Sequence, residues 1–263
     1  MAWNLLWIVF AVCLLACAVG FKKYVYFLSI GYGFAVAAGA IATGIIFHSR
    51  LSFIPIIQLV LFVAYGARLS GYLLVREVKS AGYRKTLGEA TKTEKPIPVF
   101  VLIAMWLACA MLYTAQVSPV FFRLVNHAKE APLSLLGIVM SALGLYLEAE
   151  ADDEKTQQKK KNPDMVATKG LYKYMRCPNY FGEIVFWTGV FVSSWGVLRG
   201  AGQWIMAVVA WICIVFIMFN GAQRLEKRQN GRYGKNPAYR RYVEKTPIII
   251  PFVPLYHLNK QED

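Results

Sequence analysis

The chain has 263 residues, of which 57% are hydrophobic and only 17% are charged. This composition argues against an ordinary soluble domain, because several apolar runs reach the roughly 20 residues needed to cross a bilayer. The formal net charge of +14 would suit a nucleic-acid-binding protein, but the basic residues lie between the apolar runs, so we expect no nucleic-acid partner.

The apolar runs predict an all-α, polytopic membrane helix bundle of about seven transmembrane helices, forming one integral-membrane domain over 1–263. With the C-terminus placed in the cytoplasm, 24 of the 29 Lys and Arg residues fall on the cytoplasmic side and four on the other. The positive-inside rule then favours an outer N-terminus, in either a bacterial inner membrane or an endoplasmic reticulum membrane. The predicted spans are 3–20, 24–47, 51–75, 97–121, 132–150, 181–198 and 202–222.

The third predicted span carries a polar stripe on an otherwise apolar helix. Gln58, Tyr65, Arg68, Tyr72 and Arg76 recur at spacings of seven, three, four and four, which puts them on one helical face. Tyr72 and Arg76 are typical of a membrane interface, where such side chains extend toward water. The deeper residues Gln58, Tyr65 and Arg68 are candidates for a functional site.

The stretch 145–187 is the most informative part of the chain. Its helix ends in carboxylates that include Glu148 and Asp152, a lysine-rich linker follows, and apolar sequence resumes after Pro178. An ionisable residue at a membrane helix is costly to bury and is therefore a functional candidate. Pro178 suits a first helical turn, and residues 179, 183 and 187 would then share one face.

The tail after residue 223 is basic and aromatic, with too few apolar residues to span a membrane. Arg224 and Arg228 are four residues apart, and forked guanidinium groups suit phosphate oxygens. Contact with anionic lipid would explain the same charges. Tyr239 and Tyr242 could stack on, or hydrogen-bond to, a ligand bound there.

Several motifs in 132–255 together resemble the steroid 5α-reductase-like membrane family, which includes sterol and enoyl reductases. They are the Glu148/Asp152 pair, the Gly170-Leu171-Tyr172-x-Tyr174 run, the R-x-P-N-Y-F-G-E run of 176–183, and the Tyr233-Gly234, Tyr239, Tyr242 and Ile250-Pro251-Phe252 positions of the tail. Isoprenylcysteine carboxyl methyltransferases are more distantly similar. Cys177 departs from the family, which commonly has His there, and the second predicted span lacks the acidic residue that 5α-reductases carry.

The resemblance implies an NADPH-dependent reductase of a C=C bond conjugated to a carbonyl in a steroid, sterol, polyprenol or fatty enoyl substrate. It assigns 1–131 to the substrate, 132–255 to the cofactor, and the cytoplasmic tail to closure of the cofactor site. It matches Tyr65 to the tyrosine that donates a hydrogen bond to the substrate carbonyl, with Arg68 or Gln58 tuning it. Residues expected to contact NADPH are Glu148, Asp152, Lys159, Tyr174, Asn179, Tyr180, Glu183, Trp187, Arg224, Arg228, Tyr239 and Tyr242.

Two alternatives remain open from the sequence. One is an S-adenosylmethionine-dependent methyltransferase acting on a lipid-linked substrate, and the other is a non-catalytic lipid-binding or assembly protein. Glu183 favours the reductase, since the methyltransferases commonly have an apolar residue there. None of the five cysteines forms a metal-binding spacing, so we expect neither a metal site nor a disulfide, and the oligomeric state stays open.

Overall fold

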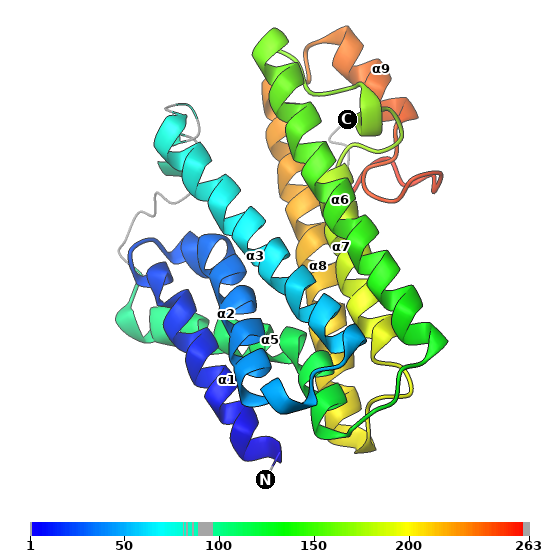
Figure 1. Ribbon diagram of the computed structural model, residues 1–263. Helices are drawn as coiled ribbons and strands as arrows, with labels where there is room; N and C mark the ends of the chain where they lie inside the picture. Colours follow the sequence, from blue (N-terminus) through cyan, green and yellow to red (C-terminus); the bar gives the residue numbers. More distant parts are fainter. Residues whose placement is uncertain (1, 81, 83, 86, 89–96, 260–263) are drawn as a thin grey trace. The chain divides into compact units, whose positions relative to one another are not determined.

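The computed structural model describes residues 2–80, 82, 84, 85, 87, 88 and 97–259, and these contain helices but no strand (Figure 1). The predicted all-α class is therefore confirmed. The helices are α1 (Ala2–Cys17), α2 (Ile30–Ile46), α3 (Phe53–Lys79), α5 (Val99–Val125), α6 (Pro132–Lys161), α7 (Pro178–Ser193), α8 (Gly200–Tyr233) and α9 (Pro237–Lys245), with short 3₁₀ turns at Ala18–Phe21, Tyr24–Leu28, His48–Arg50 and Gly170–Lys173.

Among the described residues, five helical segments are long and apolar enough to cross a membrane. They are Trp3–Phe21, Phe53–Lys79, Val99–Val125, Pro132–Lys161 and Gly200–Tyr233. The other two predicted spans, 24–47 and 181–198, correspond to α2 with 17 residues and α7 with 16. At 1.5 Å per residue both measure only about 25 Å, somewhat less than the hydrocarbon thickness.

The predicted span 24–47 is interrupted near its start. Tyr24–Leu28 forms a 3₁₀ turn, and the backbone of Ser29 has φ −133° and ψ −97°, so α2 begins only at Ile30. Tertiary hydrogen bonds hold this turn: the Tyr113 hydroxyl donates to the Phe27 carbonyl at 2.5 Å, and the Tyr26 hydroxyl donates to the Glu77 carboxylate. These bonds link the turn to α5 and α3, which a hydropathy pattern does not predict.

Helices α6 and α8 continue furthest beyond their predicted ends. Helix α6 extends through the region predicted as a lysine-rich linker, as far as Lys161, because Glu, Lys and Gln are strong helix formers. Helix α8 likewise continues from the predicted end near residue 222 to Tyr233, so Arg224 and Arg228 lie on a helix. The polar ends of both helices therefore belong to the helical framework.

The chain divides into two compact units. The first contains Met1–Ile138 and Phe191–Ala210, and the second contains Val139–Val190 and Trp211–Asp263. In the first unit, α2 packs against α1, α3 and α5. A Cβ atom on Gly66 would lie 2.2 Å from the Gly33 carbonyl oxygen, so α2 and α3 approach as closely as glycines allow. The assignment of substrate and cofactor to separate halves stays a prediction.

Candidate functional site

In the second unit, α6 and α7 are in backbone contact at two glycines. A Cβ atom on Gly144 would lie 2.3 Å from the Phe186 nitrogen, and one on Gly182 would lie 2.7 Å from the Glu148 nitrogen. Any larger side chain at either position would force the helices apart. This contact sets Gly182, and with it the neighbouring Glu183, against the turn of α6 that carries Glu148.

Three carboxylates on these two helices are buried. Glu148 is 3% exposed, Asp152 is 9% exposed and Glu183 is 6% exposed. Glu148 and Asp152 are one turn apart on α6, so they share a face of the helix. Because burying a carboxylate is costly and acidic residues at membrane helices are functional candidates, these three residues are the strongest candidate site in the unit.

Helix α7 has the predicted start and the predicted polar face. It begins at Pro178, and Asn179, Glu183 and Trp187 follow within it at four-residue spacing. Trp187 is buried and Asn179 half-buried. Tyr180 packs toward α8, since a Cβ atom on Gly221 would lie 3.3 Å from its ring. Tyr174, which precedes α7, is about half exposed.

Lys159 has a structural role that the sequence did not indicate. Its ammonium donates to the Pro163 carbonyl at 2.7 Å, the Met165 carbonyl at 2.8 Å and the Tyr233 hydroxyl at 2.8 Å. An ammonium has three N–H donors, so each of them has an oxygen acceptor. Contact with NADPH, which the family resemblance implies for Lys159, would require at least one of these bonds to be replaced.

The two tail tyrosines pack into the same unit. Tyr239 is 1% exposed, and its hydroxyl donates to Asn230 Oδ1 at 2.6 Å. The half-buried Tyr242 donates to the Tyr172 carbonyl at 2.7 Å. Both hydroxyls therefore stabilise the fold of the tail. Arg224 and Arg228, by contrast, are exposed on one face of α8, where a phosphate could reach them.

A buried ion pair between Arg176 and Glu226 was not predicted from the sequence. Arg176 Nη2 lies 2.9 Å from Glu226 Oε1, and the two side chains are 2% and 0% exposed. Arg176 belongs to the motif at 176–183, whereas Glu226 lies on α8. The only sequence signal for Glu226 was a single acid among basic residues in the run RLEKR.

The same ion pair anchors the end of the chain. Glu226 accepts hydrogen bonds from the Leu258 nitrogen at 2.9 Å and the Asn259 nitrogen at 3.0 Å, and His257 Nδ1 lies 3.1 Å from it. Arg176 donates from Nη2 to the Tyr256 carbonyl and from its backbone nitrogen to the Pro247 carbonyl at 2.8 Å. The tail is thus tied to the start of α7 and to α8.

Cys177 lies beside this ion pair and is 2% exposed. Burial raises the pKa of its thiol from 9.0 to about 12, and the charges of Lys155 and Arg176 only partly offset this. The thiol therefore stays protonated at neutral pH and behaves as an apolar core group, not as a nucleophile.

The raised thiol pKa predicts a loss of stability in alkaline solution. Below about pH 9 the folded and unfolded thiols are both protonated, so the contribution of Cys177 is fully present. As the pH rises from 9 toward 12, the unfolded chain releases the proton first and the folded state loses stability. We expect the melting temperature in detergent to fall less steeply between pH 8 and 10 for Cys177→Ala than for the wild type; equal slopes would contradict the assignment.

In the first unit, Tyr65 lies in a buried cluster of aromatic rings. It is 0% exposed, and its ring meets that of Tyr32 edge-on with centroids 5.7 Å apart. The Tyr32 ring also stacks on that of Tyr113, with centroids 4.9 Å apart. The Gln116 side-chain nitrogen lies 3.4 Å from the Tyr32 hydroxyl oxygen. The sequence analysis did not single out Tyr32 or Gln116 as neighbours of Tyr65, because neither residue stands out from the apolar pattern of its own helix.

The polar stripe of α3 divides between two environments. Gln58, which is 2% exposed, donates through Nε2 to the Ser193 hydroxyl at 2.8 Å. Arg123 donates to the Ser193 carbonyl at 2.6 Å and to the Ser134 hydroxyl at 2.5 Å, so Gln58 is next to this network. Gln58 is about 10 Å along the helix from Tyr65. Arg68, which is half-buried, lies about one turn after Tyr65 on the opposite side from Gln58 along the chain.

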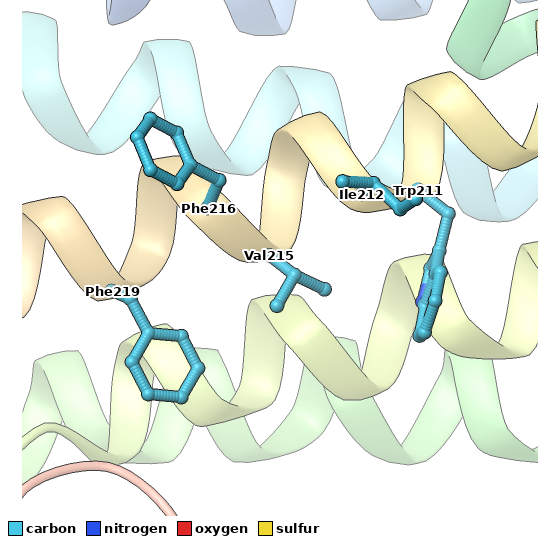
Figure 2. Close-up of a pocket in the computed structure, with 5 residues that line it drawn as sticks. All are labelled: Trp211, Ile212, Val215, Phe216 and Phe219. Carbon is cyan, nitrogen blue, oxygen red and sulfur yellow. The ribbon is translucent and has the colours of Figure 1, made fainter.

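A shallow apolar groove of about 270 Å³ lies on α8 (Figure 2). Its lining residues are Trp211, Ile212, Val215, Phe216 and Phe219. The one polar group among their side chains, Trp211 Nε1, already donates to the Thr188 hydroxyl at 3.0 Å. The groove therefore offers hydrocarbon contacts and no group that would recognise a nucleotide.

The helical architecture, with five helices long and apolar enough to cross a membrane among the described residues, is that of a polytopic helical membrane protein. A family model described as "Protein of unknown function (DUF1295)" matches residues 14–246. The chain belongs to this family, which is the steroid 5-alpha-reductase-like family. The family resemblance inferred from the motifs is thereby confirmed.

Curated relatives match at low identity. The chain is 24% identical to "3-oxo-5-alpha-steroid 4-dehydrogenase 1" of Bos taurus, over 60% of this chain and 58% of the relative. It is 32% identical to "Steroid 5-alpha-reductase DET2" of Arabidopsis thaliana, over 45% of this chain and 41% of the relative. The matched region thus spans about two fifths to three fifths of these relatives. No solved structure matches the chain significantly.

Proposed function

We propose that this protein is a membrane-embedded, NADPH-dependent reductase of a C=C bond conjugated to a carbonyl in an apolar, steroid-like or lipid substrate. The observation that carries the proposal is the burial of three carboxylates, Glu148, Asp152 and Glu183, on α6 and α7, two helices in close contact at Gly144 and Gly182. Membership of the steroid 5-alpha-reductase-like family and the names of the curated relatives support the same reaction class.

The residues of the second unit fit such a cofactor. Carboxylate oxygens accept hydrogen bonds, and the carboxamide and ribose hydroxyls of NADPH supply donors, so Glu148, Asp152 and Glu183 would hold that part. Carboxylates repel phosphates, which the exposed Arg224 and Arg228 would bind instead. Asn179, Tyr180, Trp187 and Tyr174 would complete the contacts from α7 and the segment before it.

Tyr65 is the proposed electrophilic group of the first unit. NADPH, when bound, would supply a hydride to the β carbon of the conjugated C=C bond, negative charge would develop on the carbonyl oxygen, and a proton from water would then reach the α carbon. A buried hydroxyl held by packed rings is a pre-oriented donor to that oxygen in a site of low dielectric constant. Arg68 would strengthen the donor, and Gln58 would act through the packing of α3.

The substrate is proposed only as a class. Steroid, sterol, polyprenol and fatty enoyl groups all present an apolar body and one conjugated carbonyl. We further propose an outer N-terminus and a cytoplasmic C-terminus, which would put the basic ends of α6 and α8 on the side where NADPH is found.

Nucleotide-dependent thermal stabilisation of the detergent-purified protein tests this function. A ligand at 100 times its Kd adds about 2.7 kcal/mol to the stability of the folded state. We expect NADPH to raise the melting temperature. Glu183→Gln should lower the affinity for NADPH roughly 10- to 100-fold, since a charged hydrogen bond is worth about 1.5–3 kcal/mol. Glu244→Gln, an exposed change on α9, is the matched control.

Two results would contradict the proposal. Stabilisation by S-adenosylmethionine in place of NADPH would favour a methyltransferase. If a folded Glu183→Gln variant bound NADPH with unchanged affinity, Glu183 would not bind the cofactor, and the buried carboxylates would not form the cofactor site.

A further inference from the structure

The turn near the end of the chain exposes an unusual amount of apolar surface. Residues 250–255 are an unbroken apolar run, Ile-Pro-Phe-Val-Pro-Leu. Phe252 is 87% exposed and Val253 is 43% exposed, although Ile248 and Ile249, just before them, are 1% and 0% exposed. The turn therefore has a buried base and an apolar tip that faces away from the protein.

The backbone holds the tip in this outward conformation. Phe252 has φ +64°, a region that residues other than glycine rarely adopt and that costs about 1–2 kcal/mol per residue. A bulky aromatic side chain in this conformation requires support from its surroundings. Phe252 is thus exposed in a backbone conformation that itself costs free energy, and its ring does not pack against the core.

The base of the turn is closed and anchored on both sides. The Ile248 nitrogen donates to the Leu255 carbonyl at 2.8 Å, and the Leu255 nitrogen donates to the Val253 carbonyl at 2.7 Å. Before the turn, Pro247 accepts a hydrogen bond from the Arg176 backbone; after it, Leu258 donates to the buried Glu226. The Arg176–Glu226 ion pair therefore anchors the base of this turn.

Aromatic and basic groups surround the tip. The Tyr174 ring, which is 48% exposed, lies 6.3 Å from the Phe252 ring, and the Lys173 ammonium lies 5.9 Å from the Tyr174 ring. Exposed aromatic rings next to lysine are typical of the polar boundary of a membrane. The same unit contains residues 139–161 of α6 and 211–233 of α8, two of the helices that are long and apolar enough to cross a membrane.

We infer that the tip of this turn, residues 251–254, inserts into the boundary between lipid headgroups and acyl chains. The apolar side chains of Phe252 and Val253 would enter the acyl region, and Lys173 would meet anionic headgroups. The turn lies outside the residues matched by the family model, 14–246, and the inference does not depend on the proposed reductase activity.

Site-specific fluorescence quenching tests the insertion. The full-length Phe252→Cys protein is labelled with the fluorophore NBD and reconstituted in vesicles of phosphatidylcholine and phosphatidylglycerol. We expect strong quenching by lipid that carries a nitroxide near its headgroup, and weak quenching by aqueous iodide. Glu244→Cys, at an exposed position of α9, should show the reverse, and Val253→Cys should repeat the result at 252.

The labelling background is measured on the wild-type protein, whose Cys177 and other cysteines are buried or half-buried. Iodide quenching at 252 equal to that at 244 would place the turn in water and overturn the inference. Protection at 252 from both iodide and nitroxide lipid would show that the turn covers another part of the protein, which would also overturn it.

Discussion

Replacing Glu226 with alanine is expected to destabilise the protein by about 3–5 kcal/mol. The change leaves the buried guanidinium of Arg176, whose side chain is 2% exposed, without its carboxylate partner. It also removes the acceptor of the Leu258 and Asn259 backbone nitrogens, so the tail loses part of its anchor. Equilibrium denaturation in mixed micelles measures the change in the free energy of unfolding.

Two variants separate this effect from loss of charge in general. Glu244→Ala removes a carboxylate from an exposed position and should change stability by no more than about 0.5 kcal/mol. The double variant Arg176→Met, Glu226→Leu should be more stable than Glu226→Ala, because no buried charge is left unpaired. If Glu226→Ala were as stable as Glu244→Ala, the ion pair would have no structural importance.

Tyr65→Phe is expected to lower the rate of reduction by roughly 100- to 1000-fold, while NADPH affinity changes little. The expectation rests on the proposed function: the substrate carbonyl would lose its donor, and the nucleotide would keep all its contacts. Because Tyr65 is 0% exposed and packs edge-on against Tyr32, the phenylalanine ring should occupy the same space. Single-turnover oxidation of bound NADPH with an enone substrate in nanodiscs measures the rate.

Tyr72→Phe is the matched control on the same helix. Tyr72 is half-buried, and its ring lies 5.9 Å from the guanidinium of Arg76, as expected for a membrane-interface residue. Loss of the Tyr72 hydroxyl should leave turnover near the wild-type rate. A wild-type rate in Tyr65→Phe would contradict the role of Tyr65 but would leave the cofactor assignment intact.

The local features of the second unit were predictable from sequence. Pro178 at the start of α7, and the common helical face of Asn179, Glu183 and Trp187, follow from short-range rules of helix geometry. The motifs at 176–183 and in the tail were specific enough to indicate the family. Such predictions succeed because the interacting positions lie within a few residues of each other.

Partners distant in sequence were not predictable. Lys159 was expected to contact NADPH, yet its ammonium bonds to Tyr233, 74 residues away. Arg176 and Glu226 are 50 residues apart, and nothing in the sequence alone pairs this arginine with that acid among many charged residues. Tyr32 and Tyr65 meet only because α2 and α3 pack closely at Gly33 and Gly66.

The sequence by itself determined the helical class, the membrane-length segments and the family, because hydrophobic length and local motifs are properties of contiguous residues. Only the tertiary structure decided that Glu148 and Glu183 are buried beside one helix contact, and that Phe252 is exposed on an anchored turn. Burial and exposure depend on which helices approach one another. In this chain, glycines allow the close approach of α2 to α3 and of α6 to α7, and the Arg176–Glu226 ion pair anchors the tail.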